Sequence, residues 1–411
     1  MRPSPTSAHV LGALLIAACS GGGGDWAGTV TDSAGVMIVS NPDRGIWTAA
    51  TQWRVEEDLR VGALEGDPNY QFGQIGFIAV GSDGRMFVLD AQAQQVRVFS
   101  AEGDYELSFG GPGGGPGEIG PGALFVLRSA GDTILVPDLA NRRINRYGPD
   151  GSAIGSSPLE LEKGLPMVYR STTSGTVAQQ IRPLALPDLP TTDSMDAIVL
   201  LAPDGSVTDT VIKFPSGGTI SLGGGSPEIN LYSPEPSWDI RDDLKVLYGR
   251  NEAYRVGLYS AGGIPERIIT KPFERMPVTD RDKHAVMGSL EKLWSQAGVP
   301  PAVMPQLRAL VNFGEFLPAF ANIQAGPQGT TWIQHVQRAS DLSEEQLDNY
   351  NIIEESGAPD WDVFDSEGRF LGIVTMPDRF APRVFSGDRI YGVWRDELDV
   401  QYLVRLKING M

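Results

Sequence analysis

Apolar residues in this chain are grouped into short segments, separated by turns that contain glycine, aspartate and proline. Residues 86–90 read MFVLD and residues 134–138 read ILVPD; each is followed, after a short turn, by a second such segment, QVRVF at 95–99 and RINRY at 143–147. Short apolar segments bounded by turn residues predict β-strands. The 50 glycines and 30 prolines of the 411-residue chain also suit a fold with many turns, so an all-β protein is expected.

The strand pattern repeats. Gly117, in PGEIG, follows Gly73, in FGQIG, by 44 residues, and residues 86–99 align with residues 134–147 without a gap. A repeat of roughly 40 residues built from short strands is typical of a β-propeller, with one blade per repeat. Six blades are predicted, at residues 74–112, 120–162, 165–216, 234–274, 316–377 and 380–408. The last has three strand candidates, so residues 53–62 are expected to supply its fourth strand, which would close the ring and remove exposed sheet edges.

One segment departs from the strand pattern. Residues 279–298 begin with a candidate N-cap threonine, end at a glycine, and place Val286, Leu290 and Leu293 on one helical face. With a second short helix at 302–311, they predict a helical insertion at about 279–312, between the fourth and fifth blades. Two placements remain open at this point, a lid over one mouth of the central channel and a hairpin packed on the side of the propeller.

The N-terminus reads as a targeting segment. Arg2 precedes an apolar run at 10–18 that is too short to span a membrane, and residues 16–19, IAAC, resemble the lipobox of bacterial lipoproteins. This resemblance implies a signal peptide at 1–18 and a lipid on Cys19; the alternative is an ordinary secretory signal. A flexible glycine-rich tether at 19–34 and a propeller domain at 35–411 are then expected, held outside the cytoplasm and touching the membrane through the lipid alone.

Residues 136–147, VPDLANRRINRY, resemble an NHL repeat, through Asp138, Asn141, Arg143, Ile144 and Tyr147. The first blade keeps Asp90, Val96 and Phe99 but has Ala93 and Gln95 where asparagine and arginine are expected. From about residue 35 onward, the chain resembles bacterial six-bladed β-propeller lipoproteins. Because members of that group largely lack an assigned function, the resemblance implies a fold and little chemistry.

Charge and glycine content narrow the choice of partner. With 51 Asp and Glu against 33 Lys and Arg, the formal net charge is −18, which disfavours nucleic acid. The glycine-rich stretch at 109–122 lacks the lysine of a P-loop, and its prolines remove backbone N–H groups that a phosphate would need. It is therefore predicted to be a junction between blades.

Propellers bind ligands at the axial mouth, where strand ends and connecting loops meet. Aligning the end of each second strand predicts a ring of mixed charge around it: Asp90, Asp138, Gln180 or Arg182, Arg250, His335 and Arg395. We take Asp90, Asp138, Arg250, His335 and Arg395 as candidate ligand-binding residues. For Asp90 and Asp138 a structural alternative stays open, in which each carboxylate accepts turn N–H groups of its own blade.

The sequence contains no G-x-S-x-G motif, the pattern around the nucleophile of many serine hydrolases. Its three histidines and one cysteine also disfavour a zinc site built from several His and Cys side chains.

The leading hypothesis is a monomeric, non-enzymatic module that binds a protein partner or a small polar ligand. The alternative is a metal-dependent hydrolase or lyase, such as a lactonase-like propeller enzyme, with Asp90, Asp138, His335 and Glu397 as candidates. No cofactor is firmly predicted, but calcium stays open because it needs only oxygen ligands. Residues 394–399, WRDELD, are best interpreted as a charged hairpin loop.

Overall fold

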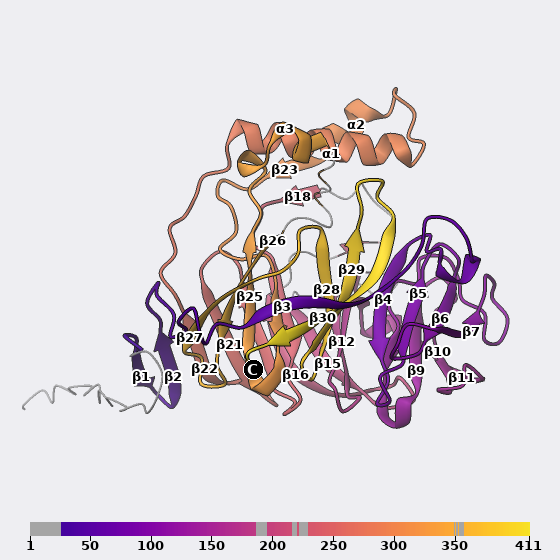
Figure 1. Ribbon diagram of the computed structural model, residues 1–411, viewed down its shortest axis with the longest axis horizontal. Helices are drawn as coiled ribbons and strands as arrows, with labels where there is room; N and C mark the ends of the chain where they lie inside the picture. Colours follow the sequence, from indigo (N-terminus) through magenta and orange to yellow (C-terminus); the bar gives the residue numbers. More distant parts are fainter. Residues whose placement is uncertain are drawn as a thin grey trace, which may run out of the picture.

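The computed structural model describes residues 26–185, 195–215, 220–221, 229–348, 350, 352 and 357–411. Its main body consists of six sheets, each built on four antiparallel strands and arranged as the blades of a β-propeller (Figure 1). The predicted all-β, six-bladed fold is confirmed.

Blades 1 to 3 follow one another along the chain. Blade 1 contains β4 (Ile75–Val80), β5 (Met86–Asp90), β6 (Gln95–Phe99) and β7 (Tyr105–Gly110). Blade 2 contains β8 (Leu127–Arg128), β9 (Ile134–Asp138), β10 (Arg143–Tyr147) and β11 (Ala153–Pro158). Blade 3 contains β12 (Leu165–Ser171), β13 (Val177–Arg182), β15 (Met195–Leu201) and β16 (Val207–Pro215).

Blades 4 to 6 complete the ring. Blade 4 contains β19 (Pro236–Ile240), β20 (Val246–Arg250), β21 (Arg255–Ser260) and β22 (Ile264–Thr270). Blade 5 contains β24 (Ile323–Ala325), β25 (Thr331–Val336), β26 (Gly357–Phe364) and β27 (Phe370–Thr375). Blade 6 contains β28 (Phe380–Ser386), β29 (Arg389–Arg395) and β30 (Gln401–Asn409), and its fourth strand is β3 (Arg54–Val61).

The predicted closure by the N-terminal strand is confirmed. β3 pairs antiparallel with β30, from Arg54 opposite Asn409 to Val61 opposite Leu403. One apolar cluster then joins blade 6 to blade 1, since Val61 and Leu403 pack with Ile78 and other buried residues of blade 1. Pairing the two ends of the domain in one blade ties the ring shut without leaving a free edge at the seam.

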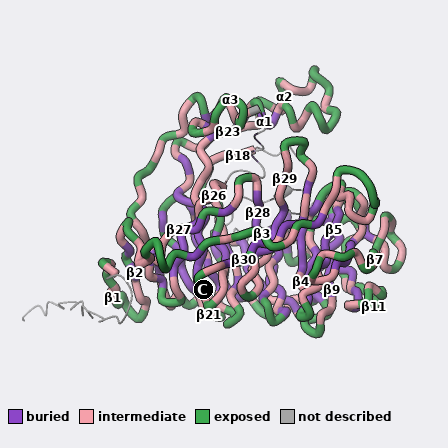
Figure 2. The backbone as a smooth tube through the Cα atoms, viewed as in Figure 1, coloured by how far each residue is buried: buried purple, intermediate pink, exposed green. Residues whose placement is uncertain are grey.

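Strand position explains the apolar pattern. All five residues of β5 are buried because this strand lies inside its sheet and between neighbouring blades. β7, the outermost strand of the same blade, alternates between exposed and half-buried residues, as a strand with one solvated face does. Figure 2 shows the same contrast, with buried segments concentrated in the strands of the propeller.

An N-terminal hairpin extends blade 4. β1 (Thr29–Ser33) pairs with β2 (Val36–Ser40), and β2 pairs in parallel with β22, which makes this sheet six-stranded. β2 lies at the start of the segment 35–411 that we assigned to the propeller domain. β1 lies within the segment 19–34 that we expected to be a tether, so part of that segment forms a strand.

Three helices and two short parallel strand pairs lie outside the blades. They are α1 (Asp280–Gln296), α2 (Met304–Arg308), α3 (Glu344–Asp348), β14 (Leu184–Ala185) with β17 (Ile220–Ser221), and β18 (Ile229–Leu231) with β23 (Val311–Phe313). Five short 3₁₀ helices complete the described elements: η1 (Pro68–Tyr70), η2 (Ala130–Asp132), η3 (Leu161–Lys163), η4 (Pro327–Gly329) and η5 (Ala339–Asp341). None of the helices among the described residues has the length and hydrophobicity needed to cross a bilayer.

α1 and α2 confirm the helical insertion predicted between blades 4 and 5. A capping box starts α1, because the side chains of Thr279 and Asp282 each accept a backbone N–H of the other. Val286 and Leu290 of α1 are buried against Ala339 and Tyr350, which belong to the connection between β25 and β26 that also carries α3. α1 and α3 therefore share a small apolar core, and we call these two helices, together with α2, the cap.

Figure 1 shows the three helices of the cap together above one end of the propeller strands. Because α3 lies in the connection from β25 to β26, this is the end where the second strand of each blade finishes and its third strand starts. We call it the capped end. Of the two placements left open by the sequence, the observed one is over an end of the propeller and not along its side.

Candidate functional site

The predicted ligand-binding ring falls where the alignment put it. Asp90, Asp138, Arg182, Arg250 and Arg395 are the last residues of β5, β9, β13, β20 and β29, and His335 is the penultimate residue of β25. All six therefore lie near the capped end. Their surroundings divide them into two groups.

Asp90 has the structural role that was left open as an alternative. It is fully buried, and its carboxylate accepts the backbone N–H groups of Gly73 and Ala93, each at 3.0 Å. Arg97 Nη2 lies 3.2 Å from its Oδ2. These contacts close the turns of blade 1 and leave no exposed surface for a ligand, so Asp90 is withdrawn from the candidate site.

Asp138 is equivalent in blade 2. It is fully buried and accepts the N–H of Gly120 at 2.8 Å, and the N–H and Nδ2 of Asn141 at 3.0 and 2.7 Å. Arg143 in turn donates to the carbonyls of Gly114 and Gly115, at 3.0 and 2.7 Å. The glycine-rich stretch is thus held as a blade junction, as predicted, and Asp138 is withdrawn as well.

Arg395 and the WRDELD segment belong to a hairpin. Arg395 is buried, and its Nη1 lies 3.7 Å from Asp399 Oδ1. Asp396 accepts the N–H groups of Leu398 and Val400, both at 2.9 Å, which shapes the turn between β29 and β30. Glu397 is exposed on this turn. The loop interpretation accounts for these contacts.

The remaining candidates lie in blades 3 to 5, where polar side chains form two groups. The first, here called the Arg250 cluster, consists of Gln180, Arg182, Asp196, Glu235 and Arg250. Asp196 is fully buried on β15 and accepts Nε2 of Gln180 at 2.7 Å and Nη2 of Arg182 at 3.1 Å. Trp238 Nε1 donates to the Oε1 of Gln180 at 2.8 Å, which fixes the amide across the boundary between blades 3 and 4.

Glu235 joins this cluster from the start of blade 4. Partial enclosure raises the pKa of Glu235 above its ordinary value, although the charges of Arg182 and Arg250 oppose the shift. Arg250 is 31% exposed, lies 3.3 Å from Glu252 Oε2, and donates to the carbonyl of Pro234 at 3.3 Å. The charges of two guanidinium groups therefore act on a carboxyl group whose pKa is still raised.

The second group, here called the Asp362 network, spans blades 4 and 5. Asp362 is fully buried on β26; it accepts the hydroxyl of Tyr254 at 2.5 Å and Nζ of Lys271 at 2.9 and 3.0 Å, and His335 Nε2 lies 3.0 Å from its Oδ1. Lys271 Nζ also lies 4.1 Å from the centre of the Phe370 ring. His335 is the most accessible member, with 34% of its side chain exposed.

Charge pairing dominates the electrostatics of the Asp362 network. Burial alone would raise the pKa of Asp362, but the hydrogen bond from His335 and the charge of Lys271 outweigh it, and the pKa is lowered. Burial and the neighbouring carboxylate raise the pKa of Tyr254 well above its ordinary value. Asp362 is accordingly a charged acceptor and Tyr254 a neutral donor.

Sequence reasoning found His335, Arg250 and Arg182 but missed Tyr254, Lys271, Asp362, Asp196 and Glu235. His335, Arg250 and Arg182 could be found because each lies at a repeat position, at or next to the end of the second strand of its blade. Asp362 and Lys271 are 91 residues apart and meet only because two blades pack together. No local pattern indicates that contact.

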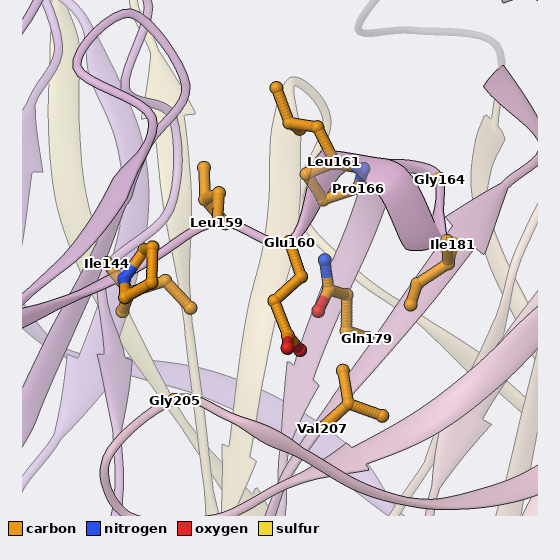
Figure 3. Close-up of a pocket in the computed structure, with 11 residues that line it drawn as sticks. Ile144, Leu159, Glu160, Leu161, Gly164, Pro166, Gln179, Ile181, Gly205 and Val207 are labelled. Atoms are coloured by element: carbon orange, nitrogen blue, oxygen red, sulfur yellow. The ribbon is translucent and has the colours of Figure 1, made fainter. Parts of the chain in front are cut away.

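Within the described ranges, no three His, Cys, Asp or Glu side chains come together as metal ligands. Figure 3 shows a cavity between blades 2 and 3, lined by Ile144, Leu159, Glu160 and Gln179 among others, with a volume of about 20 Å³. That space holds about one water molecule.

Comparisons with known proteins agree on architecture. A family described as 6-bladed beta-propeller matches residues 57–168, less than half of the chain. Among curated proteins, no sequence matches this chain.

Similar solved structures include a predicted exported protein of Bacteroides fragilis (12% identity, 90% of this chain and 99% of that chain, TM-score 0.49). They also include virginiamycin B lyase of Staphylococcus aureus (11% identity, 87% and 99%, TM-score 0.41) and a gluconolactonase of Xanthomonas campestris (12% identity, 85% and 98%, TM-score 0.41). Likeness at this level carries no argument about activity.

Proposed function

We propose that this protein is an extracytoplasmic binding module that holds a small polar ligand, or a polar segment of a protein partner, at the capped end of blades 3 to 5. The observation that carries this proposal is the collection of partly exposed cationic or ionisable side chains there, Arg182, Arg250 and His335. In blades 1 and 2 the equivalent positions are fully buried aspartates.

An anionic ligand suits this surface best. A guanidinium presents paired N–H donors that match a carboxylate. The charges of Arg182 and Arg250 act on Glu235, whose pKa is nevertheless raised, so a ligand carboxylate would compete with a carboxyl group that is protonated more easily than usual. The ligand class expected is therefore a small carboxylate, or an acidic side chain of a partner protein.

The test uses the mature protein, with thermal melting followed in acetate, succinate and citrate and affinity measured by calorimetry. We expect at least one anion to raise the melting temperature, and Arg250→Ala to weaken its binding about tenfold or more, as loss of a charged hydrogen bond does. Arg369→Ala is the matched control, since both arginines are 31% exposed and paired with a carboxylate, but Arg369 lies at the opposite end of the propeller. A wild-type protein indifferent to all three anions, or equal losses in both variants, would contradict the proposal.

We further infer that Cys19 is lipidated, that residues 1–18 are removed and that the protein acts as a monomer. Residues 1–25 lie outside the described part of the chain, so the inferences of cleavage and lipidation rest on the IAAC motif and the apolar run before it. In a bacterial host, Cys19→Ala is expected to move the protein from the membrane to the soluble fraction. An unchanged membrane fraction would refute the anchor, and light scattering of the mature domain tests the monomer.

A further inference from the structure

We propose a second binding site, for a neutral sugar ring, in a groove on the outer wall of the propeller between blades 3 and 4. The groove has an open volume of about 570 Å³ and is lined by β16 together with Tyr248, Tyr259, Gly262 and Gly263 of blade 4. This is within the size range of small-molecule sites and far larger than the cavity of about 20 Å³ between blades 2 and 3. It borders the Arg250 cluster, because Tyr248 precedes Arg250 by two residues on β20, but the inference does not depend on the function proposed above.

Aromatic rings form one wall. The ring centres of Phe214 and Tyr248 are 4.5 Å apart, and those of Tyr248 and Tyr259 are 6.1 Å apart at an interplanar angle of 72°. Phe214 is buried and supports Tyr248, whereas both tyrosines are half-buried. Electron-rich ring faces of this kind attract the slightly positive C–H bonds on the apolar face of a sugar.

The turn that follows Tyr259 adds open backbone to the lining of the groove. Gly262 and Gly263 have φ values of +80° and +73°, which favour glycine in this turn between β21 and β22. A Cβ added at Gly262 would meet no atom within 4 Å, and at Gly263 the nearest, Val211 O, would be 3.8 Å away. A ligand can therefore approach the main chain closely at this turn.

The polar groups of the groove favour a neutral ligand that carries hydroxyl groups. Burial raises the pKa of Tyr248 to about 12 and also raises the pKa of Tyr259, so both phenols stay protonated and can donate hydrogen bonds. The lining contains Lys213 but no Asp or Glu, in a chain with 51 such residues. An aromatic wall with hydrogen-bonding groups beside it matches the chemistry of a pyranose, which has an apolar face and hydroxyl groups at its edge.

A peptide strand is a poorer occupant, although β16 is an edge strand. The backbone N–H of Thr210 is already taken by Asp209 Oδ1 at 2.7 Å, and Pro215 has no N–H. Lys213 is exposed on the same strand. Charged residues and proline are the features that protect edges against strand addition.

Calorimetric titration of the mature protein with maltotriose, cellotriose and chitotriose tests the inference, with 2-naphthol as a neutral aromatic probe. We expect one of the sugars to bind and to be preferred over 2-naphthol. Tyr259→Ala should weaken that sugar about tenfold, whereas Tyr259→Phe, which keeps the ring, should change it much less. Tyr105→Ala removes a tyrosine from the outer strand of blade 1 and should leave sugar binding unchanged.

Thr210→Trp keeps all three aromatic residues but fills the groove, and it should abolish binding even if Tyr259→Ala folds poorly. Failure of all three sugars to bind, tighter binding of 2-naphthol, or full sugar affinity in Thr210→Trp would each overturn the inference. Anion binding at the capped end, measured with the same variants, should not change in any of them.

Discussion

Blades 1 and 2 on one side, and blades 3 and 5 on the other, each bury one aspartate completely, but on different strands. Asp90 and Asp138 end the second strand and accept backbone N–H groups from their own blade. Asp196 and Asp362 lie on the third strand and accept hydrogen bonds from the side chains of Gln, Arg, Lys and Tyr.

This difference has a functional consequence. An aspartate that binds main-chain N–H groups is satisfied within its blade and leaves nothing at the surface. An aspartate that binds long side chains fixes groups such as Arg182 and His335, parts of which remain exposed at the capped end. Blade 5, which has the second arrangement, also carries α3 of the cap.

The largest expected effect comes from Asp362→Ala. The substitution leaves the ammonium of Lys271, which is 12% exposed, beside an apolar gap, and also removes the acceptor of Tyr254. The free energy of unfolding should fall by about 3–5 kcal/mol in urea titrations followed by tryptophan fluorescence. The double variant Asp362→Ala/Lys271→Met should recover part of the lost stability. If Asp362→Ala alone lowers the free energy of unfolding by less than about 1 kcal/mol, charge pairing in this network does not stabilise the fold.

Asp138→Ala should lower the free energy of unfolding by less, about 1–3 kcal/mol. The substitution leaves neutral N–H donors of a turn without an acceptor, but it leaves no buried charge without a partner. Anion binding at the capped end should stay at the wild-type level in this variant. The same urea titration makes the measurement. Equal costs for Asp138→Ala and Asp362→Ala would erase the distinction between the two kinds of blade.

Lowering the pH should remove the stability that the charge of Asp362 contributes. The lowered pKa of Asp362 means that its contribution to stability is present above the ordinary aspartate pKa of about 3.9 and is lost as pH falls through the folded value below it. The gap in melting temperature between wild type and Asp362→Asn should therefore be constant from neutral pH to about pH 5 and shrink below about pH 4. A gap that persists at the lowest accessible pH would contradict the assigned charge.

The smallest effect is expected at Glu235. Because its pKa is raised, the contribution of Glu235 to stability is fully present below the ordinary glutamate pKa of about 4.3. That contribution is lost as pH rises through the pKa of the folded protein. Because the side chain is exposed, Glu235→Gln should raise the melting temperature at pH 7 by only about 1 °C. A clear destabilisation would instead place Glu235 in a strong ion pair with Arg182 or Arg250.

Local chemistry made much of this protein predictable. The alternation of short apolar segments and turns predicted six blades and the helical insertion that starts at Thr279, because each element depends on residues close together in the chain. The closing strand at 54–61 was predicted because the last blade lacked a fourth strand of its own. Repeat position also located the ends of the second strands, and with them Arg250 and His335 at the capped end.

Tertiary structure decided the rest, because packing of whole blades brings together residues that are far apart in sequence. Asp362 meets Tyr254 across 108 residues, the cap core joins α1 to the connection between β25 and β26, and the groove beside Tyr259 exists only where blade 4 faces β16. The role of a buried aspartate likewise depends on its neighbours. It either accepts N–H groups of its own turn or holds side chains at the candidate site, according to which donors lie next to it. Pattern along the chain determines which elements form; the angle and spacing between those elements determine which side chains meet.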